Sequence, residues 1–198
     1  MGKGEATRER ILDTAARLAA REGLAGLSLA QLAQSLGVSK SGLFAHFRSK
    51  EELQLETLRA FSTRFIAEVI RPAFARPRGL PRLRAVFENW LRRTLDRSFP
   101  GGCLFMAASI ELDDREGPAR EFLVQSMRDL LGLLSRTARL AVDEGHLRKD
   151  LDCDQFAFEQ YGILLGLNHA LRLLRDPHAE RRARDAFEAL VRASLPRS

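Results

Sequence analysis

The sequence predicts an all-α fold of about nine helices, and three observations support that prediction. Leucine, alanine, arginine and glutamate, which favour helices, are abundant, whereas tyrosine and tryptophan occur once each. Apolar residues recur at helical spacing along most of the 198 residues, and no segment has a convincing strand pattern. The chain is 45% hydrophobic and 29% charged, as is typical of a globular protein, and no apolar run is long enough to span a membrane.

The first predicted helix covers about residues 7–22 and ends at Gly23. Its apolar face is formed by residues at helical spacing, which are Ile11, Leu12, Ala15, Leu18 and Ala19. Arg8 and Arg10 lie near its start, where they either reach a nucleic-acid backbone or remain solvated. The sequence does not separate these two readings.

Residues 28–50 predict two short helices, a tight turn between them and the start of a third helix. Ser28 is the first N-cap, with Gln31 as its capping-box partner. Gly37 stands where a C-cap glycine belongs. Residues at the spacing of one buried helical face lie between these caps, and they are Leu29, Leu32, Ala33 and Leu36.

The second short helix begins after Ser39, its predicted N-cap. Leu43 and Phe47 supply its inner face and are expected to be core residues. Ser49 then caps a third helix, with Glu52 as its capping-box partner. A short helix, a glycine turn and a second short helix form the helix-turn-helix layout, whose second helix enters the DNA major groove.

The outward face of the second short helix is small, polar or basic, and it carries no acid. It consists of Lys40, Ser41, Gly42, Phe44, Ala45 and His46. Such a face lets a helix backbone approach DNA bases closely. Lys50 lies in the first turn of the next helix, where the helix dipole disfavours a cation unless a phosphate shares the site.

With these features together, the segment GLSLAQLAQSLGVSKSGLFAHFRSKEEL, within residues 7–61, resembles the DNA-binding region of the TetR (tetracycline-repressor) family. The resemblance covers most of the first 60 residues. The rest of the chain is similar to that family only in length and helical character. The resemblance implies a three-helix helix-turn-helix domain over residues 1–49 and a ligand-binding and dimerisation domain over residues 50–198, built as a helical bundle.

The resemblance also assigns roles to single residues. Ser28 and Lys50 would bind phosphates, and Phe44 and His46 would lie against the sugar-phosphate backbone. The groove would be faced by Ser39, Lys40, Ser41 and Gly42, with Lys40 as the donor to guanine. Two positions depart from the family pattern. Phe44 replaces a tyrosine that is common in the family, so a phenolic hydrogen bond to phosphate is lost. Gly42 replaces a side chain that often reads a base, so recognition would depend more on DNA shape.

The remaining helices are predicted between clear breaks. A helix from Lys50 to about residue 71 should end at Pro72 and the segment 76–81. Further helices are expected at about residues 83–95, 103–112, 119–142, 154–175 and 179–195. The segments between them are 98–102, 113–118, 145–152 and 176–178.

The resemblance implies two roles for this second part of the chain. The last two helices would pair with their copies in a homodimer, and Gly162 and Gly166 would allow close approach there, although they could equally accommodate a bulky neighbour in one subunit. A small effector would occupy a pocket. Its implied lining is Phe61, Phe65, Phe87, Trp90, Phe105, Met106, Ser109, Phe122, Met127 and His169. The apolar neighbours of His169 in the sequence favour a hydrogen-bonded core histidine, with pocket lining as the alternative.

The sequence carries no catalytic or phosphate-binding motif, so we expect no enzyme activity, no cofactor and no metal. Asp150, Asp152 and Asp154 fail the calcium-loop pattern and should form a connector that caps the next helix. Cys103 and Cys153 match neither a zinc site nor a disulfide framework. They are read as packed thiols, with redox sensing by Cys103 as the alternative.

Charge and the N-terminus complete the functional prediction. Of the net charge of +6, +4 lies in residues 1–50, which favours a polyanion partner there. The N-terminus has no apolar signal segment, so a cytoplasmic location is expected. The sequence thus predicts a ligand-responsive repressor that binds a palindromic DNA operator as a homodimer, without a membrane. Alternatives are an activator or ligand-independent DNA-binding protein, and an all-helical enzyme or carrier.

Overall fold

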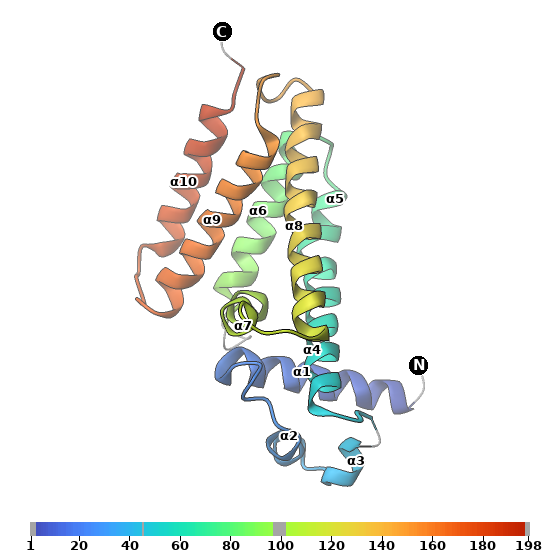
Figure 1. Cartoon of the computed structure of the whole chain (residues 1–198). Coiled ribbons are helices and arrows are strands. Elements are labelled where there is room, and N and C mark those ends of the chain that lie inside the picture. Colours follow the sequence, from blue (N-terminus) through green and yellow to red (C-terminus); the bar gives the residue numbers. More distant parts are fainter. Residues whose placement is uncertain (1–2, 45, 97–101, 197–198) are drawn as a thin grey trace. The chain divides into compact units, whose positions relative to one another are not determined.

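The computed structural model describes residues 3–44, 46–96 and 102–196, with only the backbone described for Lys3, Gly4, Lys40 and Phe44 (Figure 1). These ranges contain helices and no strand, which confirms the all-α prediction. The elements are α1 (Lys3–Glu22), α2 (Leu29–Leu36), α3 (Lys40–Phe44), α4 (Lys50–Phe65), the π-helix η1 (Ile66–Ile70), α5 (Arg71–Phe74), α6 (Leu80–Leu95), α7 (Leu104–Leu112), α8 (Pro118–Asp143), α9 (Cys153–Arg172) and α10 (Ala179–Ala193). Because α4, η1 and α5 follow one another without a break, they form one helical run, which gives nine helices in the described part.

Two compact units make up the chain. The first contains residues 1–64 and 97–126, and the second contains residues 65–96 and 127–198. The predicted domains, residues 1–49 for DNA binding and residues 50–198 for ligand binding and dimerisation, are a functional division and not a division into compact units. That functional division stays a prediction.

The first unit is held together by a small core beneath α1, α2 and α3. Its buried members are Ile11, Leu12, Ala15, Leu27, Leu32, Ala33, Leu43, Phe47 and Leu53. The predicted inner faces of the first three helices therefore meet in one cluster. Ion pairs add to it from α4, since Arg64 pairs with Asp13 and Arg8 pairs with Glu56.

The long helix passes through Pro72 and ends at Phe74, which lies between the two breaks, Pro72 and residues 76–81, that predict its end. Proline has no N–H and its ring crowds the carbonyl four residues earlier, so it usually breaks a helix interior. Here the preceding turn widens into η1, where the Arg71 N–H donates to the Ile66 carbonyl five residues back. Pro72 then lies in the first turn of α5, where its missing N–H is tolerated, and the helix ends at Phe74.

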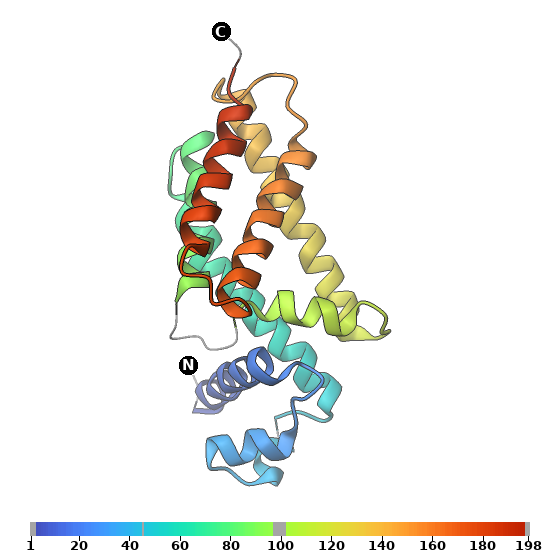
Figure 2. The ribbon, with the colours of Figure 1, turned by 90° about the vertical axis from the view of Figure 1, so that its left-hand side faces the viewer.

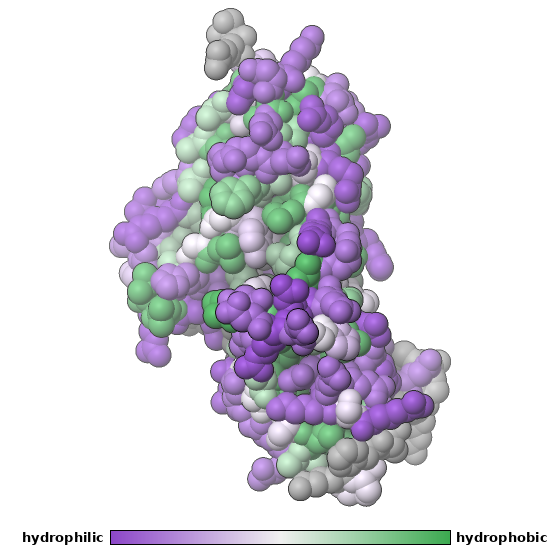
Figure 3. All heavy atoms as spheres, in the orientation of Figure 1, coloured by the Kyte–Doolittle hydropathy of each residue, from purple (hydrophilic) through white to green (hydrophobic). Residues whose placement is uncertain are grey.

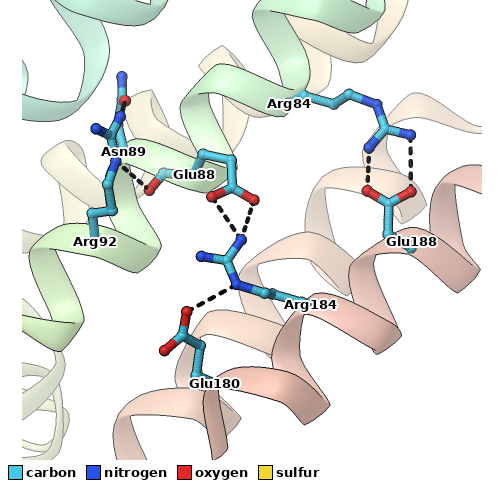
Figure 4. Close-up of polar contacts among 7 residues, drawn as sticks. All are labelled: Arg84, Glu88, Asn89, Arg92, Glu180, Arg184 and Glu188. Atoms are coloured by element: carbon cyan, nitrogen blue, oxygen red, sulfur yellow. Dashed lines mark hydrogen bonds and ion pairs between the residues drawn. The ribbon is translucent and has the colours of Figure 1, made fainter.

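In the second unit, α6 and α10 are joined by a ring stack between two groups of ion pairs. The Phe87 and Phe187 rings stack with centroids 3.8 Å apart and planes inclined by 3°. Arg84 forms a two-bond pair with Glu188, and Arg184 binds the Glu88 carboxylate at 2.6 and 2.7 Å (Figure 4). These half-exposed pairs contribute less stability than the ring contact, because solvent screens them.

α9 and α10 lie side by side in the second unit (Figures 1 and 2). Asp152 caps α9 by accepting the N–H groups of Asp154 and Gln155 at 3.0 and 2.9 Å, which confirms its predicted capping role. At the turn between α9 and α10 a hydrophobic patch is visible, where Leu173 and Leu174 are exposed (Figure 3). None of the helices in the described ranges combines the length and the apolar character that crossing a bilayer needs.

Candidate nucleic-acid interface

The α2 helix and the turn after it have the predicted geometry. The Ser28 Oγ accepts the Gln31 N–H at 3.2 Å, and Gly37 adopts a left-handed conformation with φ of 65°. The Gly37 N–H donates to the Gln34 carbonyl at 3.2 Å, and that of Val38 to Ala33 at 3.1 Å. The Gln31 side chain departs from the predicted capping box, because its amide donates to Glu22.

The Ser39 cap of α3 is confirmed. Its Oγ accepts the Gly42 N–H at 3.1 Å and lies 3.0 Å from the Ser41 Oγ. Leu43 and Phe47 are fully buried, as predicted for the inner face of this helix. Phe47 lies just beyond the end of α3, and its N–H donates to the Leu43 carbonyl at 3.1 Å. Leu43 within the helix and Phe47 after it therefore fix α3 with respect to the core of the first unit.

The outward face of α3 is open to solvent. Ser39, Ser41 and Gly42 are exposed, and His46 is half-buried. At Gly42 an added Cβ would contact the Ser39 Oγ at 3.3 Å and no other atom of the described residues. The predicted contacts of the Lys40 and Phe44 side chains lie outside the described residues, as does Ala45.

The Ser49 cap places Lys50 at the start of α4. The Ser49 Oγ accepts the Glu52 N–H at 3.0 Å, while the Glu52 carboxylate accepts the N–H of Arg48 at 2.7 Å rather than that of Ser49. The Lys50 side chain is exposed, and its Nζ donates to the Ala25 carbonyl at 2.6 Å. The ammonium group that is predicted to bind a phosphate is therefore already held by a hydrogen bond to the backbone.

Arg8 has a different role from the two that the sequence suggested, and Arg48 is a basic residue for which no role was predicted. Arg8 is a structural residue, since it pairs with Glu56 at 2.5 Å and its guanidinium lies 5.4 Å from the Phe47 ring centroid. Arg48 is exposed directly after the buried Phe47, and sequence reasoning passed over it. Its position in the loop directly after α3 could have indicated it as a candidate DNA contact.

The predicted effector-pocket residues fall into both compact units. In the first unit Phe61 and Phe105 are buried, with ring centroids 5.1 Å apart. The Ser109 Oγ donates to the Phe105 carbonyl at 2.7 Å, and the half-buried Phe122 lies under Arg59. Met106 is also buried.

In the second unit the predicted lining residues centre on Trp90. Phe65 contacts it edge-to-face with centroids 4.9 Å apart, and Tyr161, which sequence reasoning missed, lies 6.1 Å away. The Phe87 ring stacks on the Phe187 ring, and Met127 is half-buried. His169 is exposed in the single chain, so the core-histidine reading is wrong, because the apolar neighbours in its sequence lie on other faces of α9. The pocket itself stays a prediction.

The cysteines show no arrangement for a metal. Cys153 is buried, and this burial raises the pKa of its thiol, so it is unsuited to redox chemistry. Cys103 is half-buried, and the alternative of a redox role for it stays untested. Within the described ranges no three side chains of the metal-binding types lie close enough to hold an ion.

A capped α2, a left-handed glycine and a buried anchor under a short exposed α3 define a helix-turn-helix DNA-binding protein. Comparison with known families agrees. The model described as "Bacterial regulatory proteins, tetR family" matches residues 11–57, and "Tetracyclin repressor-like, C-terminal domain" matches residues 79–187, more than half of the chain. The chain belongs to the TetR family of transcriptional regulators.

Three individual proteins illustrate this likeness. The transcriptional regulator TcmR of Streptomyces glaucescens is 31% identical over 151 residues, which span 75% of this chain and 63% of TcmR. A TetR regulator from Chloroflexus aurantiacus has a TM-score of 0.81 at 23% identity, covering 97% of this chain and 96% of its own. A TetR-family regulator from Cytophaga hutchinsonii has a TM-score of 0.84 at 18% identity, covering 100% and 99%. The two structures show the shared fold.

Proposed function

We propose that this regulator is a homodimeric repressor that binds a palindromic operator and is released from it by a small molecule. The observation that carries the proposal is the open face of α3, where Ser39, Ser41 and Gly42 are exposed above the buried Leu43 and Phe47. Small residues on a rigidly anchored helix let its backbone approach base edges. As bacterial DNA lies in the cytoplasm, the protein would act there.

The backbone contacts would come from residues at both ends of the motif. Ser28 and Lys50 stand at the starts of α2 and α4, where free N–H groups favour phosphate oxygens. His46 would lie beside the sugar-phosphate backbone. Lys40 would supply direct base reading through guanine, and the bare Gly42 would leave part of the recognition to DNA shape.

The open face of α9 supports a homodimer. Phe158 is 67% exposed and Leu165 38% exposed in the single chain, although both are large and apolar. Gly162 lies between them in sequence and Gly166 directly follows Leu165, and a Cβ added at either glycine would meet no atom of the described residues within 4 Å. A second copy of α9 could therefore approach closely and cover the apolar side chains. Two motifs would then meet major grooves about 34–36 Å apart or wider.

An effector would act by favouring a dimer whose two motifs no longer match the operator spacing. A coupling free energy of about 1–3 kcal/mol would lower operator affinity about 5- to 150-fold. The aromatic residues around Trp90 in the second unit are the proposed source of effector contacts, since rings and a few polar groups are typical of ligand sites.

The test is to select duplexes from a random library with the full-length protein and to measure affinity at several salt concentrations. We expect palindromic sequences and a log–log salt slope of about −0.9 per phosphate contact. Lys50→Ala should weaken all sequences alike and reduce the slope by about one unit. Binding that ignores both sequence and salt would instead favour a helical enzyme or carrier.

Two further readouts test the regulatory part of the proposal. Screening metabolites by thermal shift and then by operator release should identify an effector, and its absence from an exhaustive set would favour a ligand-independent regulator. Transcription from a promoter carrying the selected site should fall when the protein is added. A rise would instead make the protein an activator.

A further inference from the structure

A carboxylate on α7 binds the loop between α1 and α2. The Glu111 Oε1 accepts the Leu24 N–H at 2.9 Å, and its Oε2 accepts the Ala25 N–H at 2.8 Å. All these residues belong to the first compact unit, in which α7 packs against α1 (Figure 1). Hydrogen bonds to a charged group are about twice as strong as neutral ones, so Glu111 is a firm anchor for two successive peptide groups.

The carbonyl groups of the same two residues are bound from α4. The Gln54 Nε2 donates to the Leu24 carbonyl at 2.8 Å, and the Lys50 Nζ donates to the Ala25 carbonyl at 2.6 Å. Side chains from two helices therefore satisfy both donors and both acceptors of this dipeptide. A surface loop is seldom held so completely, since its backbone groups can usually bond to water.

Gly23 makes room for this arrangement. Its φ is +88°, and a Cβ added there would lie 2.8 Å from the Glu111 Oε1. A side chain would therefore both strain the backbone and displace the carboxylate. Gly23 therefore both ends α1 and leaves the space that the Glu111 carboxylate needs to bind the loop.

The contacts form a chain that ends at the DNA-binding surface. Glu111 fixes the Ala25 peptide, and the Ala25 carbonyl fixes the Lys50 ammonium. A lysine ammonium has three N–H donors, so one bond to Ala25 leaves two for a phosphate. Holding a long flexible side chain in advance removes part of the entropy loss on binding, about 0.5–1.5 kcal/mol for one side chain.

We propose that Glu111 is a positioning residue for operator binding, which acts through Ala25 on Lys50 and thereby links α7 to the phosphate contact. The inference rests on the proposed function, because it requires that Lys50 binds a phosphate. Since α7 also carries predicted pocket residues, Phe105 and Ser109, an effector that moves α7 would act on Lys50 by this route.

The experiment is a double-mutant cycle on the full-length protein with the duplex selected from the random library. Glu111→Gln keeps the shape of the side chain but places an amide N–H₂ against a backbone donor, and it should weaken binding about 5-fold. Lys50→Ala should weaken it about 20-fold, as for a hydrogen bond to a charged group. The double variant should bind within about twofold of Lys50→Ala, because Glu111 acts through the lost lysine.

Glu121→Gln is the matched control, since it removes the same charge from an exposed position on α8 in the same unit. It should leave affinity unchanged. Hydrogen exchange supplies an independent readout, because the Leu24 and Ala25 amides should exchange faster in Glu111→Gln than in wild type. If Glu111→Gln lowers general stability, Gln54→Ala frees the same loop from α4 and should show a weaker effect that is also absent from the Lys50→Ala background.

The outcomes separate the two proposals. Losses that multiply in the double variant, or an affinity that Glu111→Gln leaves unchanged, would overturn the positioning role while operator binding by the wild type stands. A wild-type protein that shows no sequence-selective, salt-dependent binding would overturn the proposed function and this inference with it.

Discussion

The open faces of α3 and α9 are both left uncovered in the single chain, but they differ in chemistry. At α3 the exposed residues among those described include Ser39, which caps the helix, and Ser41 and Gly42 within it, and all three are short. On α9 the exposed residues include Phe158 and Leu165, which are large and apolar. Both helices lie over buried residues. Loose packing of the helices therefore does not explain why these faces are exposed.

The difference indicates two kinds of partner. A short polar face gains little from leaving water unless a polar, charged partner such as DNA replaces the lost hydrogen bonds. An exposed apolar face gains about 25 cal/mol per Å² from being covered, which favours another protein surface and, by symmetry, a second copy.

Phe47→Ala should abolish the support beneath α3. Phe47 is fully buried in the small core of the first unit and lies under the Arg8 guanidinium. Its truncation should reduce the free energy of unfolding by about 3–5 kcal/mol through cavity formation. Urea denaturation measures this loss, and operator binding should disappear with it. Unchanged stability would mean that α3 is held by something other than its inner face.

Phe158→Arg should disrupt the proposed dimer interface on the apolar face of α9. A charge placed in each half of a symmetric interface should cost about 2–5 kcal/mol and shift the dimer to folded monomers. Sedimentation velocity measures the shift. The matched control is Ile110→Arg on α7, which is 79% exposed and lies outside the proposed interface. A dimer that tolerates the arginine at position 158 but not at 110 would place the interface elsewhere.

Ser28→Ala should weaken the start of α2 without changing its packing. The lost hydrogen bond from the Gln31 N–H to the Ser28 Oγ should lower stability by about 1 kcal/mol. Thermal unfolding detects this change. Ser35→Ala, on the exposed side of the same helix, should be neutral or slightly stabilising, because alanine is the better helix former. Equal effects of the two substitutions would contradict a capping role.

Glu56→Gln should flatten the acid-side loss of stability. Burial alone would raise the pKa of Glu56, but hydrogen bonds and charge from Arg8 and Arg59 outweigh it and lower the pKa. A lowered folded-state pKa contributes stability that is present above the ordinary glutamate value of about 4.3 and is lost as pH falls through the folded value. Because Arg8 and Arg59 are substantially exposed, the effect should stay below about 1 kcal/mol.

Urea denaturation at several pH values checks this prediction. Wild type should lose more stability than Glu56→Gln as pH falls below about 4.3. Glu9→Gln, at an exposed position on α1, should keep the wild-type slope. If the two variants behave alike, the arginine pairs of Glu56 contribute nothing to folding.

Features that depend on neighbouring residues could be predicted from the sequence. Caps at Ser28, Ser39 and Ser49, and the left-handed turn at Gly37, each involve atoms within four residues. The buried Leu43 and Phe47 follow from helical spacing for the same reason. The two capping boxes were only half right, because the long side chains of Gln31 and Glu52 had other partners within reach.

Features that depend on distant residues could not be predicted. Nothing near Pro72 in the sequence shows that the helix widens at η1 and continues. His169 has apolar neighbours in sequence, yet it is exposed, because helix phase and not composition decides burial. Glu111 stands 86 and 87 residues from the amides that it binds, so no local pattern could connect them.

Local sequence patterns account for the all-α class, the helix-turn-helix motif and the exposure of Ser41 and Gly42 on its second helix, because propensity, capping and apolar spacing act over one or two helical turns. The contacts that hold that motif in place come instead from residues far apart in the sequence. The anchor of Glu111 on Leu24 and Ala25, and the hold of Ala25 on Lys50, arise where α7 and α4 meet the loop after α1. Such contacts depend on how helices pack, and packing is a property of the whole folded chain.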